Sequence, residues 1–162
     1  MSLRALVFVA LTALLAPAQA PAQIFDGRFF GGGTIFGFSD ACVAAGWTNN
    51  ALAYSVRYQP AGLGYNGSRS LLAFFVLNQA FAFQIEGPFT SRWQDVEHLL
   101  IMDGAFLNTP EHDHPTRLRI RNQNPRVIDE TTTGPVRIRG QVQNFAATTG
   151  CQVNFELLLQ QR

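Results

Sequence analysis

The sequence predicts an all-β protein, built as an antiparallel β-sandwich or a small β-barrel of about eight strands. Three observations predict this class. Apolar and polar residues alternate in several segments, turn-forming residues separate these segments, and no long segment carries a clear helical pattern. Because most of the expected strands have one polar face, a parallel sheet buried on both sides is not expected.

The expected strands follow one another along the chain. In residues 52–59, Leu52, Tyr54, Val56 and Tyr58 alternate with small or polar residues, which predicts a half-buried strand. Residues 69–77 are almost continuously apolar and predict a central strand. The remaining expected strands are 33–40, 81–85, 117–121, 136–143 and 151–160.

Residues 91–102 fit two interpretations. Ser91 followed by Gln94 resembles the capping box that begins a helix. An alternation typical of a strand is also present, at Val96, His98, Leu100 and Met102. We favour a strand, because the surrounding segments are all predicted strands.

The glycine-rich stretch "FFGGGTIFGF" lacks the Lys and the Ser or Thr of a phosphate-binding loop. Glycines beside strand aromatics more often mark bulges or strong bends. We therefore expect an irregular strand here rather than a nucleotide site.

The first 22 residues predict a secretory signal peptide. Arg4 precedes an apolar run from Ala5 to Ala16, which is shorter than the roughly 20 residues of a membrane-spanning helix. Small residues follow, and a cut after Ala22 avoids leaving a proline as the first mature residue. We expect a periplasmic or secreted protein whose single all-β domain comprises residues 23–162.

Two cysteines, Cys42 and Cys151, are the only ones in the chain. An even number in an exported protein predicts a disulfide, because disulfides persist outside the cytosol. A bond between them requires Cα atoms within about 7 Å. The first and last strands are therefore expected to be tied together.

Composition argues against several classes of function. All 12 basic residues are arginine, and without Arg4 the remaining arginines equal the 11 acidic residues in number. A neutral domain predicts no nucleic-acid partner. The sequence contains neither G-x-S-x-G nor H-E-x-x-H, so we expect neither an enzyme nor a bound cofactor.

A histidine pair is the first candidate site. In an extended backbone His112 and His114 point to the same side, where two imidazoles could bind zinc or copper with a carboxylate or His98 as a further ligand. Pro110 and Pro115 bracket the pair, however, which favours a solvated turn. A periplasmic metal-binding protein is thus an alternative function.

An arginine-rich strand face is the second candidate. Alternation places five arginines opposite the apolar residues of two expected strands: Arg117, Arg119, Arg121, Arg137 and Arg139. Neighbouring carboxylates such as Glu156 and Glu86, together with solvent, offer an ordinary way to neutralise them. Alternatively the face docks an anionic partner, since the planar guanidinium suits carboxylates and phosphates.

The sequence therefore predicts an exported, non-catalytic binding or structural module. The partner class is an acidic glycan, a lipid head group or an acidic protein. A second alternative is a small outer-membrane β-barrel with arginines inside. We do not expect membrane insertion, because several predicted strands are shorter than the roughly 9 to 11 residues that a membrane span needs.

Overall fold

The structure, a computed structural model, describes residues 26–77, 79–102, 105–108 and 114–161; the predicted signal peptide lies outside them. One antiparallel sheet has the strand order β5-β8-β9-β10-β1-β2-β3-β4-β6-β7. The elements are β1 (Phe29–Phe36), α2 (Asp40–Ala44), β2 (Leu52–Gln59), β3 (Arg69–Val76), β4 (Gln79–Glu86), β5 (Gln94–Asp95), β6 (Glu97–Met102), β7 (Ala105–Asn108), β8 (Arg117–Asn124), β9 (Val136–Gln143), the 3₁₀ helix η2 (Phe145–Ala147) and β10 (Gln152–Gln161). The predicted all-β class is confirmed.

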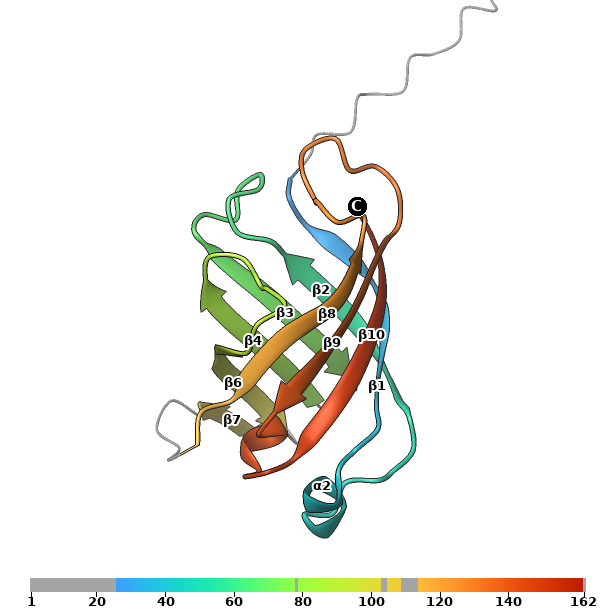
Figure 1. The fold of residues 1–162 in the computed structure, drawn as a ribbon, viewed down its shortest axis with the longest axis vertical. Coiled ribbons are helices and arrows are strands. Elements are labelled where there is room, and N and C mark those ends of the chain that lie inside the picture. The colour runs from blue at the N-terminus through green and yellow to red at the C-terminus, as the bar shows by residue number, and fades with distance from the viewer. Residues whose placement is uncertain (1–25, 78, 103–104, 109–113, 162) are drawn as a thin grey trace, which may run out of the picture.

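The sheet curls into a nearly closed barrel because one extended segment joins its two ends. At the start of this segment, β5 pairs with β8, and the backbone amide of Val96 then donates to the carbonyl of Thr116 at 2.9 Å. At its end, β6 pairs with β4. In Figure 1 the wall formed by β8, β9 and β10 lies in front of β2, β3 and β4. The preference for a strand over a helix in residues 91–102 is confirmed by β5 and β6, whereas residues 91–93 belong to no strand.

Aromatic side chains fill the inside of the barrel. The six largest fully buried residues are Phe29, Phe74, Phe81, Phe83, Phe145 and Phe155. Inward-facing glycines leave room for these rings: a Cβ on Gly140 would overlap the ring of Phe155. Small and large residues alternate inside small barrels for this reason. The alternation read from the sequence therefore describes a packed barrel interior.

The glycine-rich strand differs from the expectation. β1 pairs with both β10 and β2 without a shift of register, so the expected bulge is absent from the described strand. Glycine is needed there for close approach instead, because a Cβ on Gly31 would overlap the backbone carbonyl of Leu158. The strand spans Phe29–Phe36 rather than 33–40, and helix α2 begins at Asp40.

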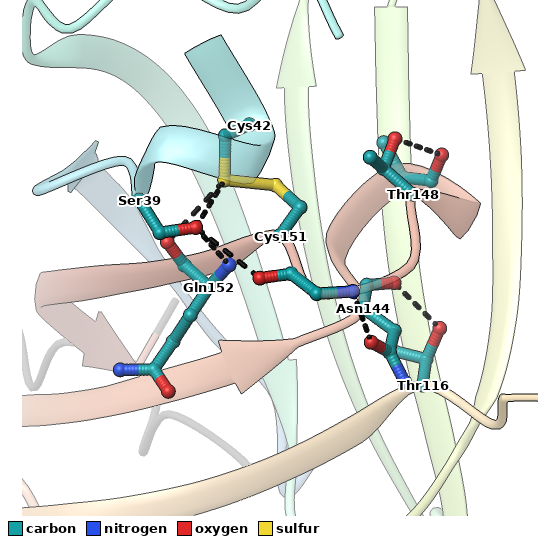
Figure 2. Close-up of a disulfide and its surroundings, with 9 residues drawn as sticks. Ser39, Cys42, Thr116, Asn144, Thr148, Cys151 and Gln152 are labelled. Carbon is teal, nitrogen blue, oxygen red and sulfur yellow. Dashed lines mark hydrogen bonds between the residues drawn. A yellow bond between two sulfur atoms is a disulfide. The ribbon is translucent and has the colours of Figure 1, made fainter. Parts of the chain in front are cut away.

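A disulfide joins Cys42 in α2 to Cys151, the residue before β10, with a Cα to Cα distance of 4.5 Å. Figure 2 shows Ser39 beside the disulfide, where the Ser39 hydroxyl accepts a hydrogen bond from the backbone amide of Gln152 at 3.0 Å. Strands β1 and β10 are direct neighbours. The predicted bond and the predicted closure of the two ends are confirmed.

The turn between β9 and β10 is anchored by Asn144, which is 8% exposed. Its side-chain amide donates to the carbonyl of Pro115 at 2.9 Å, and its side-chain oxygen accepts from the amide of Gly150 at 2.9 Å. Thr116 donates to the Asn144 carbonyl at 3.1 Å (Figure 2). These bonds attach the disulfide end of the barrel to the start of β8.

Among the described residues, no helix has the length and apolar character needed to cross a lipid bilayer.

Candidate functional site

The five predicted arginines lie on neighbouring strands of the outer surface. Arg117, Arg119 and Arg121 belong to β8, and Arg137 and Arg139 to β9. The two strands pair directly, with Arg119 opposite Gln141 and Arg139 opposite Asn122. Their inward neighbours, such as Leu118 and Ile138, are buried. The structure thus brings the predicted face together, as the alternation indicated.

Three of these arginines have local partners. Arg117 Nε lies 3.0 Å from Asp95 Oδ1, and Arg139 Nη2 donates to Glu156 Oε1 at 2.8 Å. Arg119 donates from Nε and Nη2 to Gln141 Oε1 at 2.9 and 2.6 Å, and its guanidinium lies 4.3 Å from the centre of the Trp93 ring. These three guanidinium groups therefore already bind other groups of the protein itself. Of the carboxylates expected to neutralise the face, Glu156 does so and Glu86 binds Arg69 instead.

Three arginines on this side of the barrel have no local partner for their charge among the described residues. Two belong to the predicted face, and the third, Arg126, follows β8 in the chain. Within the described part of the chain, the side chains of Arg121, Arg126 and Arg137 make neither an ion pair nor a hydrogen bond. All three are exposed. Arg121 is the extra residue of a β-bulge, because the register passes from Ile120 opposite Gly140 to Asn122 opposite Arg139. The bulge turns Arg121 away from the regular row of β8.

Three depressions follow one another across this surface. The first, about 620 Å³, lies between β8 and the loop before β5 and includes Arg121 and Arg126. It shares Asn122 with a second depression of about 200 Å³ that includes Arg137 and Arg139. The second shares Arg137 with a third of about 490 Å³ over β10 and β1. We call the three together the arginine groove.

Glycine also shapes the floor of the arginine groove. Gly32 lines the third depression, and a Cβ built on it would have Tyr54 O as its nearest neighbour at 3.9 Å, outside its own chain neighbours. The absence of a side chain at this position keeps the β1 end of the groove open. Thr34 adds a hydroxyl on the same strand.

The groove contains residues that the sequence pattern did not single out. Asn122 and Asn124 place exposed amides between the free arginines, and Ser91 adds a hydroxyl at one end. The sequence does contain a sign of this irregularity, because residues 121–124 are four consecutive polar residues and break the alternation of β8. Such a break is typical of a bulge.

The histidine site lies partly outside the described residues, since His112 is not among them. His114 is exposed beside a depression of about 330 Å³ that also includes Asp95 and Arg117. The described residues contain no group of three or more His, Cys, Asp or Glu that could hold a metal. His98 lies in the core, stacked on Phe83 with ring centres 4.7 Å apart. The metal site therefore stays a prediction without a described ligand set.

Comparisons with protein-family models, with curated proteins and with solved structures find no match for this chain.

Proposed function

We propose that the protein is an exported, non-catalytic binding module that docks an anionic partner in the arginine groove. One observation carries the proposal: Arg121, Arg126 and Arg137 are exposed on one side of the barrel and have no partner among the described residues. Like charges gathered on one surface raise the free energy of the isolated protein. A bound anion would remove that cost and could accept paired hydrogen bonds from each guanidinium.

The packed interior supports a binding site on the outside. Ligand-carrying barrels keep a cavity within the sheet, whereas rings such as Phe74, Phe81 and Phe155 occupy this interior with 1% exposure or less. The outer wall formed by β8 and β9 is therefore the more suitable binding surface.

The direction of the side chains favours this proposal over an outer-membrane barrel. Transmembrane barrels carry apolar residues on their outer, lipid-facing surface and polar residues inside. Here Phe155 and Leu157 are buried inside, and Arg137 and Arg139 are exposed outside. No such geometry favours the metal-binding alternative, because Asp95, the carboxylate beside His114, already pairs with Arg117.

Export is part of the proposal. The predicted signal peptide, residues 1–22, and the Cys42 to Cys151 disulfide both suit a periplasmic or secreted protein.

The proposal is tested by retention on a sulfonate cation-exchange matrix at low salt. The groove variant combines Arg121→Gln with Arg137→Gln. We expect it to elute at clearly lower salt than the wild type, since exposed charges act over about 10 Å at about 0.1 M salt. The matched control combines Arg57→Gln with Arg69→Gln, which removes the same charge from residues of β2 and β3 that do not line the groove. Equal elution of the two double variants would contradict a dedicated anion site.

A further inference from the structure

We infer that the arginine groove binds a linear carboxylated glycan rather than a single small anion. This inference rests on the proposed function and names the class of partner for that same site.

The first argument is the length of the groove. Its three depressions share lining residues, Asn122 between the first two and Arg137 between the last two. The groove therefore continues from β8 across β9 and β10 to β1. Neighbouring strands lie about 4.8 Å apart, so this path covers roughly 14 Å. A single carboxylate or phosphate would occupy only a small part of it.

The second argument is the order of chemical groups along the groove. Arg121 and Arg126 lie at one end, and Arg137 lies where the second and third depressions meet. Between these charges stand the exposed amides of Asn122 and Asn124. A carboxylated glycan presents the matching pattern, with carboxylates separated by hydroxyl groups that amides can bind as donors or acceptors.

The third argument is the carboxylate of Glu156, which lines both the second and the third depressions. Only its Oε1 receives the hydrogen bond from Arg139. A carboxylate accepts hydrogen bonds and donates none, so it repels a ligand made only of acceptor anions, such as a polyphosphate chain. Sugar hydroxyls can donate to it. The groove therefore discriminates in favour of an anion that also carries hydroxyl donors.

Nucleic acid fits the groove less well. A single strand of nucleic acid carries a phosphate charge on every nucleotide and binds through exposed aromatic faces on which its bases stack. The aromatic ring in the groove, Phe89, is only 8% exposed. One face of the half-buried Trp93 ring is covered by the guanidinium of Arg119 at 4.3 Å. Phe89 therefore offers no stacking platform, and Trp93 has at most one free face.

The inference is tested by calorimetric titration of the full mature protein with galacturonate and with oligogalacturonates of increasing length. We expect affinity to rise with oligomer length until the groove is filled. Arg126→Gln and Arg137→Gln should each weaken the longest oligomer about tenfold, the loss expected for one charge-assisted hydrogen bond. Arg69→Gln is the matched control and should leave affinity unchanged. Each variant must keep the thermal midpoint of the wild type. Methyl-esterified oligomers, which lack the charge, should not bind.

Polyglutamate, single-stranded DNA and anionic phospholipid vesicles serve as competing probes. Equal affinity for galacturonate and its longest oligomer would overturn the linear-chain inference. Tighter binding of any competing probe, with loss in the groove variants, would overturn the glycan but leave the anion-binding proposal intact. Failure of every anion to bind, together with equal elution of the groove and control variants, would overturn both.

Discussion

At the residue scale, arginines that look equivalent in the sequence have different roles. Arg119 and Arg121 occupy the same face by alternation, yet Arg119 is held by Gln141 and Trp93 whereas Arg121 stands free in a bulge. Alternation predicts the face, because side-chain direction depends only on the period of the strand. Alternation alone does not give the partner. Arg117 pairs with Asp95 through the pairing of β5 with β8, and Arg139 pairs with Glu156, one of the two expected carboxylates, through the register of β9 and β10.

Tyr58 makes the folded protein sensitive to alkaline pH. It is 4% exposed, and burial raises its pKa to about 12. An unfolded chain ionises its tyrosines near pH 10, so the folded state is favoured fully below pH 10 and loses this advantage as pH rises from about 10 to about 12. The shift of two units corresponds to about 3 kcal/mol. Urea unfolding at about pH 9 and about pH 11 should show the loss.

Tyr58→Phe should reduce this alkaline loss of stability, because phenylalanine does not ionise. Some loss will remain, since burial also raises the pKa of Tyr54. Tyr65, which is 78% exposed, provides the matched control, and Tyr65→Phe should behave as the wild type does. An unchanged pH dependence in Tyr58→Phe would show that Tyr58 is not the group responsible.

The histidine pair is expected to be dispensable for folding. Combining His112→Ala with His114→Ala should change the free energy of unfolding by no more than about 0.5 kcal/mol, because the sequence predicts a solvated turn here and His114 is exposed. Thermal unfolding with and without added zinc or copper is the measurement. A metal-dependent rise in the midpoint that disappears in the double variant would instead support the metal-binding alternative.

At the element scale, regular strands could be predicted from the sequence and the first strand only in part. Residues 52–59 and 136–143 alternate clearly and form β2 and β9 at the predicted positions. In β1, Gly31, Gly32 and Gly33 carry no side chains that could show an alternation. The sequence therefore did not indicate where this strand begins. Helix α2 is only five residues long and has no side-chain hydrogen bond at its N-cap, which leaves little pattern to detect.

Adjacent glycines of β1 should respond oppositely to alanine. Gly31→Ala would force a Cβ into the carbonyl of Leu158, and overpacking of this kind costs roughly 1 to 3 kcal/mol. Gly32→Ala is the matched control, since its Cβ would make only an ordinary van der Waals contact with Tyr54 O, at 3.9 Å. It should leave stability unchanged or raise it by up to about 1 kcal/mol, because alanine restricts the unfolded chain. Urea unfolding of both variants tests the pair, and equal stability would contradict the close approach.

The disulfide should contribute strongly to stability. It closes a sequence separation of 109 residues, for which the chain-entropy model gives roughly 4 to 5 kcal/mol, with measured values often lower. Combining Cys42→Ala with Cys151→Ala should therefore lower the free energy of unfolding by several kcal/mol. Intact mass before and after reduction of the wild type is the control: if reduction does not add the mass of two hydrogen atoms, the bond is absent from the purified protein.

At the scale of the whole molecule, the barrel is held together unevenly around its circumference. The β1 to β10 junction pairs eight residues on each strand, whereas the β5 to β8 junction pairs two. Beyond those two pairs, the latter is supported by the amides of Val96 and Ile120, which donate to Thr116 and Thr90. The disulfide joins segments beside the stronger junction, because Cys42 follows β1 and Cys151 precedes β10. The weaker junction is where the barrel should open.

Amide hydrogen exchange can locate this opening. We expect the amides of Val96 and Ile120 to exchange at least about tenfold faster than that of Leu157 in β10, because local opening of a short junction costs less free energy than global unfolding. Asp95→Asn removes the ion pair with Arg117, which is worth up to about 1 kcal/mol at an exposed site. It should speed exchange at Val96 by up to about fivefold and leave Leu157 unchanged. Equal exchange at all three amides would mean that the barrel opens as one cooperative unit, with its short junction no weaker than the rest.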